Sequence, residues 1–222
     1  MRNYRIHFIR HGMTSNNQQG QYIGCRTDAE LSIQGIRDLI AIKEKMPYPE
    51  VEVVYTSPMA RCCQTAGVLY PAHEFLTVPQ LREMDFGDFE GKTIEDLKDS
   101  EDYQKWIANS MTVAPPNGES GEDFLARVIE GFQYIIRDMM NADLHEAAVI
   151  THGGVIMTLL AGIGLPRRSM FEWHCENGEG YTCLVNAQLW FRDGLIEVAD
   201  FCPQPPVTEE EEALEDYGWN KV

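Results

Sequence analysis

Apolar residues along the chain fall into short runs typical of buried strands and longer runs with a helical repeat. The short runs stop abruptly at glycine, proline or polar residues, and strands are predicted over 5–10, 51–55, 74–78 and 147–151. In the longer runs apolar residues recur every three or four positions, and helices are predicted over 33–42, 60–69, 121–139 and 155–163. Ser32 and Ser120 precede two of these helices and are predicted to cap them.

Strands that alternate with helices predict an α/β fold with a mostly parallel sheet. A hairpin is predicted near the end of the chain, where strands over 189–191 and 196–201 would flank Arg192-Asp193-Gly194. Residues 84–118 break the alternation with glycine, charge and two short helices, so we expect an insertion that caps a site. The prediction is one domain over 1–202, followed by an acidic, solvated tail over 203–222.

Composition narrows the classes of partner. The 222 residues carry 18 Lys and Arg against 35 Asp and Glu, a net charge of −17, which argues against nucleic acid and anionic membranes as partners. No apolar run reaches the roughly 20 residues that span a bilayer, and the first residues lack the apolar core of a signal peptide, so a cytoplasmic protein is expected. The six cysteines form no Cys-x-x-Cys pair and are expected to be free thiols.

Two strand ends share one form, in which an apolar strand is followed by a histidine, a glycine and a helix. The carboxyl ends of parallel strands line the ligand crevice of such folds, and glycine lets the backbone come close to a ligand. A third strand end is followed by an arginine on the opening turn of the next helix. One sheet edge would therefore gather four cationic or titratable side chains, Arg10, His11, Arg61 and His152. Such a cluster suits a phosphate group, because the guanidinium fork matches phosphate oxygens.

Six motifs follow one another over residues 5–163. They are Arg10-His11-Gly12-Met13-Thr14 with Asn17, Leu31-Ser32-x-x-Gly35, Ser57-Pro58-Met59-Ala60-Arg61-x-x-x-Thr65-Ala66, Leu81-Arg82-Glu83-Met84-Asp85-Phe86-Gly87-Asp88-Phe89-Glu90-Gly91, Pro116-x-Gly118-Glu119-Ser120 and Val149-Ile150-Thr151-His152-Gly153-Gly154. In this order they resemble the histidine phosphatase superfamily, which includes the cofactor-dependent phosphoglycerate mutases. Met13 and Glu30 depart from the family pattern, where glutamate and proline are common.

The resemblance implies a three-layer α/β/α fold of the phosphoglycerate mutase type with a helical cap. It also implies that His11 is the nucleophile and that Glu83 first protonates the leaving oxygen and later activates water. The phosphate would be held by Arg10, Asn17, Gly24, Arg61, His152 and Gly153, alongside His11 and Glu83. No metal and no cofactor is implied, because guanidinium groups would stabilise the charge. Glu90 is the rival acid by composition and is given a structural role, as is His7.

The substrate class follows from the same motifs. A phosphoglycerate mutase usually has Arg-His-Tyr-Gly after the acid, whereas Met84-Asp85-Phe86-Gly87 follows Glu83 here. We therefore expect a phosphomonoesterase acting on a small-molecule phosphate ester, most similar to the alpha-ribazole phosphatases. The alternatives are a cofactor-dependent mutase and an inactive phosphate-binding or scaffold protein. The sequence leaves a homodimer open.

Overall fold

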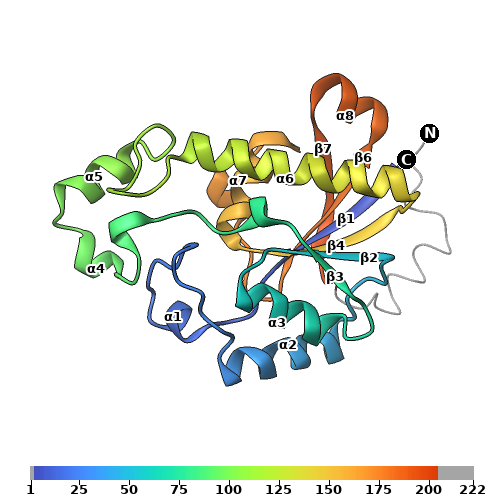
Figure 1. Ribbon diagram of the computed structural model, residues 1–222, viewed down its shortest axis with the longest axis horizontal. Helices are drawn as coiled ribbons and strands as arrows, with labels where there is room; N and C mark the ends of the chain where they lie inside the picture. The colour runs from blue at the N-terminus through green and yellow to red at the C-terminus, as the bar shows by residue number, and fades with distance from the viewer. Residues whose placement is uncertain (1–2, 205–222) are drawn as a thin grey trace, which may run out of the picture.

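The computed structural model describes residues 3–204 and is built around one seven-stranded sheet (Figure 1). Its strand order is β3-β2-β4-β1-β6-β7-β5. β1 and β4 pair in parallel, as do β2 with β4 and β2 with β3, while β6 runs antiparallel to both β1 and β7. The strands are β1 (Asn3–Arg10), β2 (Val53–Thr56), β3 (Phe75–Thr77), β4 (Glu146–Thr151), β5 (Gly164–Leu165), β6 (Gly180–Asn186) and β7 (Ile196–Cys202).

Helices cover both faces of the sheet. α2 (Ile33–Lys45) and α3 (Ala60–Leu69) pack on one face, where Leu39 and Ala66 meet Ile150 in one buried cluster. α6 (Gly121–Ala142) and α7 (Gly153–Ile163) pack on the other face, where Phe132 and Leu159 share a buried cluster with strands β1 and β4. The predicted three-layer α/β/α architecture with a mostly parallel sheet is confirmed.

Local sequence explains where the long helices begin. The side chains of Ser32 and Ser120 accept hydrogen bonds from the amides of Gly35 and Asp123, and so cap α2 and α6 as predicted. α3 begins at Ala60 and α7 at Gly153, directly after the second and fourth predicted strands. Each helix N-terminus therefore opens beside a strand end, where amide groups point toward the same edge of the sheet.

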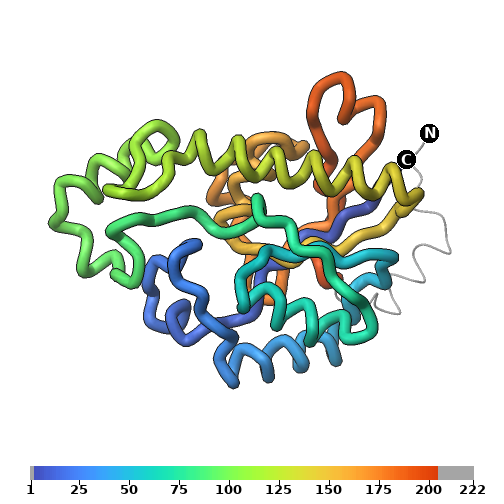
Figure 2. Tube along the Cα trace, viewed as in Figure 1, coloured from blue at the N-terminus to red at the C-terminus, as the bar shows by residue number. Residues whose placement is uncertain are grey.

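The segment between β3 and α6 projects away from the sheet (Figure 2). It holds η1 (Pro79–Leu81), η2 (Gly87–Phe89), α4 (Ile94–Leu97) and α5 (Glu101–Ala108), and it lies near α1 (Ser15–Gln18). Aromatic rings fill its interior: Tyr22, Phe86, Phe89, Tyr103 and Trp106 contact one another with centroids 5.2–6.1 Å apart. These contacts join the predicted cap to the loop that follows α1.

The predicted hairpin is wrong in its first strand. Residues 187–193 form a helix, α8 (Ala187–Asp193), because the side chain of Asn186 accepts hydrogen bonds from the amides of Gln188 and Leu189. Gly194 then ends the helix with a φ of 66°. The antiparallel partner of β7 is instead β6, which the sequence pattern did not predict.

The described residues contain no helix long and apolar enough to span a membrane.

A 3-10 turn, η3 (Met170–Trp173), links β5 to β6. All but the first two residues of the predicted tail, 203–222, lie outside the described residues.

Candidate active site

His11 lies in the turn after β1 and is held by hydrogen bonds from three directions. Its amide donates to the carbonyl of Thr151 (2.9 Å), and its carbonyl accepts from Asn177 Nδ2 (2.8 Å). Nδ1 lies 2.7 Å from the carbonyl of Gly12, which can only accept, so Nδ1 carries the proton. This tautomer leaves Nε2 with a lone pair and, among the described residues, without a hydrogen-bond partner.

The His11 ring is neutral over most of the pH range. Burial and the nearby guanidinium groups of Arg61 and Arg10 lower its pKa from 6.5 to about 3. A buried imidazole that stays unprotonated and offers a free Nε2 has the properties of a nucleophile.

His152, after β4, is bound in a different way. Nδ1 accepts a hydrogen bond from Arg61 Nε (3.3 Å), so Nε2 carries the proton and donates to Ser57 Oγ (2.8 Å). Burial and the charge of Arg61 hold the pKa of His152 well below its ordinary value. Its ring centroid lies 5.2 Å from that of His11, at an interplanar angle of 67°. The structure thus brings the two predicted histidines edge to face.

Arg61 supplies a buried positive charge. Its side chain is 1% exposed and donates to His152 and to the carbonyls of Thr27 (3.0 Å) and Gly24 (3.1 Å), all of them neutral groups. A buried guanidinium that meets only neutral partners is poorly compensated and favours an anion beside it.

Arg10 offers a second guanidinium at the same edge. Its Nη1 donates to the carbonyl of Cys175 (2.7 Å), while its Nε is buried without a partner among residues 3–204. Gly153 packs against it, since a Cβ on that glycine would lie 3.2 Å from Arg10 Nε. Glycine therefore allows the two strand ends to approach each other.

Glu83 lies beside the N-terminus of α7, the helix that follows His152. Its carboxylate accepts hydrogen bonds from the amides of Met84 (2.9 Å) and Gly154 (3.2 Å) and is 8% exposed. Burial raises its pKa above the ordinary value, although the two amides, Arg61 and Arg10 act in the opposite direction. A Cβ on Gly154 would lie 2.4 Å from Glu83 Oε1, so the carboxyl in this position requires glycine at 154.

Comparison with known proteins identifies the family. The sequence model of the histidine phosphatase superfamily (branch 1) matches residues 6–191. The chain belongs to this superfamily.

The proteins to which the chain is similar carry names of several different activities. The chain is 29% identical to the adenosylcobalamin/alpha-ribazole phosphatase of Escherichia coli over 179 residues, 78% of this chain and 86% of the relative. It is 23% identical to phosphoserine phosphatase 1 of Hydrogenobacter thermophilus over 179 residues, 78% of this chain and 82% of the relative. The phosphoglycerate mutase of Bacillus anthracis has the same fold, with a TM-score of 0.73 at 19% identity over 90% of this chain and 92% of the other.

Of the remaining predicted residues, Gly24 contacts the cluster through Arg61, whereas the hydrogen bonds of the Asn17 side chain among residues 3–204 are with Thr14. The carbonyl of Gly24 binds Arg61, and a Cβ on Gly24 would lie 2.0 Å from the carbonyl of Met84. Asn17 Oδ1 accepts from the amide and hydroxyl of Thr14 and so caps α1, which leaves its Nδ2 available as a donor. Glu90 binds Thr27 Oγ1 (2.9 Å) and the amide of Arg26 (3.2 Å), contacts that join the cap to the loop that follows α1.

Several residues that shape the site were not singled out from the sequence. Ser57 binds His152, Thr65 Oγ1 accepts from the amide of Gly12 (2.9 Å), and Asn177 fixes the backbone of His11. Ser57 and Thr65 lie in one of the quoted motifs, which could have indicated them. Asn177 belongs to no motif.

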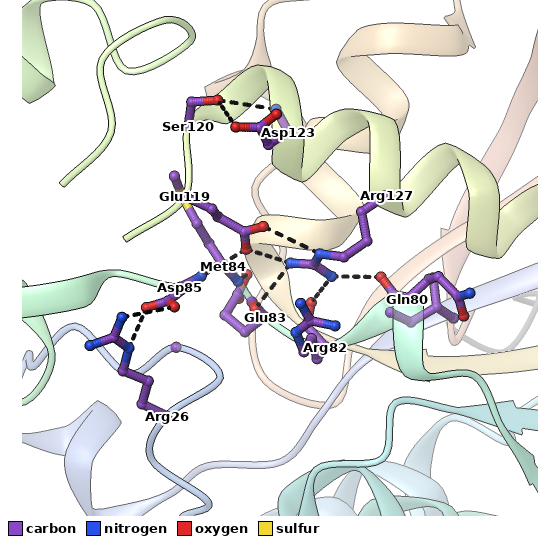
Figure 3. A network of polar contacts seen from close by, with 12 residues as sticks. Arg26, Gln80, Arg82, Glu83, Met84, Asp85, Glu119, Ser120, Asp123 and Arg127 are labelled. Atoms are coloured by element: carbon purple, nitrogen blue, oxygen red, sulfur yellow. Dashed lines mark hydrogen bonds and ion pairs between the residues drawn. The ribbon is translucent and has the colours of Figure 1, made fainter. Parts of the chain in front are cut away.

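A network of polar contacts holds the backbone around Glu83 (Figure 3). Arg127, on α6, donates to the carbonyls of Gln80 (2.7 Å) and Arg82 (2.9 Å) and pairs with Glu119 (2.5 Å). Arg26 binds both carboxylate oxygens of Asp85, at 2.7 and 3.1 Å. The segment that carries Glu83 is therefore anchored to α6 on one side and, through Arg26, to the loop that follows α1 on the other.

Proposed function

We propose that the protein is a metal-independent phosphomonoesterase that hydrolyses a small-molecule phosphate ester through a phosphohistidine. One observation carries the proposal: a neutral histidine with a free Nε2 and a carboxyl whose pKa is raised both lie near the same two guanidinium groups, which bind no carboxylate among residues 3–204. These groups match the nucleophile, the anion site and the general acid of phosphoryl transfer.

The first half-reaction forms the phosphoenzyme. The Nε2 lone pair of His11 attacks phosphorus, the ester P–O bond breaks, and the leaving oxygen takes the proton of the Glu83 carboxyl. Arg10 and Arg61 stabilise the charge on the other phosphate oxygens. The raised pKa of Glu83 keeps a larger fraction of this carboxyl protonated than an exposed glutamate would have.

The second half-reaction releases phosphate. A water attacks phosphorus, the carboxylate of Glu83 takes one of its protons, and the N–P bond breaks to regenerate neutral His11. His152 orients Arg61 by accepting its hydrogen bond at Nδ1. The N–H at Nε2 can donate to a phosphate oxygen once it no longer donates to Ser57 Oγ.

Alpha-ribazole 5'-phosphate is our proposed substrate, supported by the E. coli relative and by the Leu81–Gly91 motif. A phosphatase screen with ribazole, amino-acid, sugar and nucleotide phosphates in EDTA tests both levels. We expect turnover in EDTA, ribazole phosphate as the best substrate, and no activity in His11→Ala. Phosphoserine as the best substrate would move the substrate assignment, whereas loss of activity in EDTA or full activity of His11→Ala would overturn the mechanism.

The mutase alternative is tested separately. Incubation with 3-phosphoglycerate, with and without 2,3-bisphosphoglycerate, should give no 2-phosphoglycerate. Rapid interconversion would replace the phosphatase proposal with the mutase alternative.

A further inference from the structure

Arg127 lies on α6 behind the segment that carries Glu83, with 13% of its side chain exposed. Its Nη1 donates to the carbonyls of Gln80 and Arg82, and its Nη2 lies 3.4 Å from the carbonyl of Glu83. The guanidinium thus binds the main chain of Glu83 and not its carboxylate, whose oxygens accept from Met84 and Gly154. Figure 3 shows this fan of contacts from one side chain to one stretch of backbone.

Glu119 completes the arrangement on the other side of Glu83. Its Oε1 accepts from Arg127 Nη2 and from the amide of Asp85 (2.8 Å), while its own amide donates to the carbonyl of Asp85 (3.0 Å). The main chain is therefore held at Arg82 and Glu83 by the guanidinium and at Asp85 by the carboxylate. With 13% and 15% of their side chains exposed, the two partners are largely shielded from water, so the ion pair is stronger than a surface pair.

We propose that Arg127 and Glu119 are a positioning pair that sets the carboxyl of Glu83 at the leaving oxygen of the substrate. This inference rests on the proposed acid role of Glu83. The guanidinium suits the task because its planar fork donates several hydrogen bonds in fixed directions, which the single ammonium of lysine cannot reproduce. A displacement of about 1 Å at a catalytic group lowers the rate by on the order of 10²-fold.

The leaving group provides a sensitive test. A poor leaving group such as the alcohol of 2-phenylethyl phosphate needs proton donation, whereas the acidic phenol of p-nitrophenyl phosphate departs with little help. In Arg127→Met, kcat/KM should fall on the order of 10²-fold for the alkyl ester and by less than about 5-fold for the aryl ester. Arg127→Lys should lie between Arg127→Met and the wild type. Arg137→Met, an exposed position on the same helix, is the matched control and should leave both values unchanged.

The ratio of the two kcat/KM values does not depend on how much of a variant is folded, because both substrates report the same active fraction. If Arg127→Met yields too little protein, Glu119→Gln provides the same reading with a smaller expected selectivity. Equal losses for both substrates would mean that the pair only stabilises the fold, and would overturn the inference.

Glu83→Gln separates this inference from the proposed function. In this variant too, kcat/KM should fall much more for the alkyl ester than for the aryl ester. Adding Arg127→Met to Glu83→Gln should cause little further selective loss on the alkyl ester. Selectivity in Glu83→Gln together with none in Arg127→Met would leave the proposed function intact and refute the positioning pair. No selectivity in Glu83→Gln would instead contradict the acid role on which the proposed function depends.

Discussion

The two strand ends that carry His11 and His152 have the same form in the sequence but different chemistry in the structure. Both histidines are buried, both have a lowered pKa, and both are followed by glycine. Nδ1 of His11 donates to a backbone carbonyl and Nε2 has no partner among the described residues, whereas both nitrogens of His152 bind side chains. The hydrogen-bond partners, and not burial or charge, distinguish the proposed nucleophile from the histidine proposed to support it.

Replacing either histidine by alanine should have the largest effects and should separate the two roles. His11→Ala should lose at least about 10⁴-fold in kcat and form no acid-labile phosphoenzyme, because no other free ring nitrogen lies in the cluster. His152→Ala should lose about 10²- to 10³-fold and still become labelled at His11. Rapid-quench labelling with a ³²P-phosphate ester measures both. Labelling that survives in His11→Ala and disappears in His152→Ala would reverse the two roles.

Acid stability should reveal the depressed pKa of His11. The unfolded chain protonates this histidine near its ordinary pKa of 6.5 and the folded chain near 3, so its contribution to stability is present at neutral pH and lost as the pH falls through this window. Between pH 7 and pH 4 the wild type should lose about 3 kcal/mol more of unfolding free energy than His11→Asn. Urea unfolding of both proteins at the two pH values measures this difference, and parallel curves would contradict the buried neutral ring.

Gly154 tests how closely the second strand end approaches the acid. Gly154→Ala should place a methyl group against Glu83 and lower kcat/KM for alkyl phosphates by about 10²-fold. The matched control is Gly67→Ala on α3, where a Cβ meets nothing within 4 Å, and it should raise stability by about 0.5–1 kcal/mol without loss of activity. Thermal melts and steady-state kinetics distinguish the two. Equal activity of both variants would show that Glu83 can move away at little cost.

Ser57→Ala should have the smallest effect. It removes the acceptor of His152 Nε2 and leaves that N–H available to phosphate, so KM should change by less than about 10-fold and kcat by a similar or smaller factor. Ser57→Thr keeps the hydroxyl and is the matched control. A loss as large as that of His152→Ala would show that Ser57 fixes the orientation of the imidazole.

The elements with strong local signals were predictable from the sequence. Ser32 and Ser120 mark the starts of their helices, because a cap binds an amide only three residues away and therefore depends on local sequence. α8 was missed because the aromatic and apolar run near 190 is compatible with a strand, and only the cap at Asn186 and the turn at Gly194 favour the helix. Long-range pairing with β1, and not a local pattern, makes β6 a strand.

The site shows the same division. Arg10, His11, Arg61, Glu83 and His152 stand at strand ends or in ordered motifs, and the structure brings them together. Asn177 and Arg127 bind the backbone carbonyls of His11 and Glu83, and they come from distant segments whose packing no local spacing reveals. Motifs can therefore identify reacting groups, but the direction of a ring nitrogen depends on the folded chain.

The two guanidinium groups, whose hydrogen-bond partners are neutral, have a consequence for the protein before a substrate binds. Arg61 is surrounded by neutral partners and Arg10 Nε has none among the described residues, so an oxyanion that enters without reacting is also stabilised there. Inorganic phosphate is such an anion and is the product of the proposed reaction. Inorganic phosphate should therefore bind the free site, compete with the substrate and raise the stability of the protein.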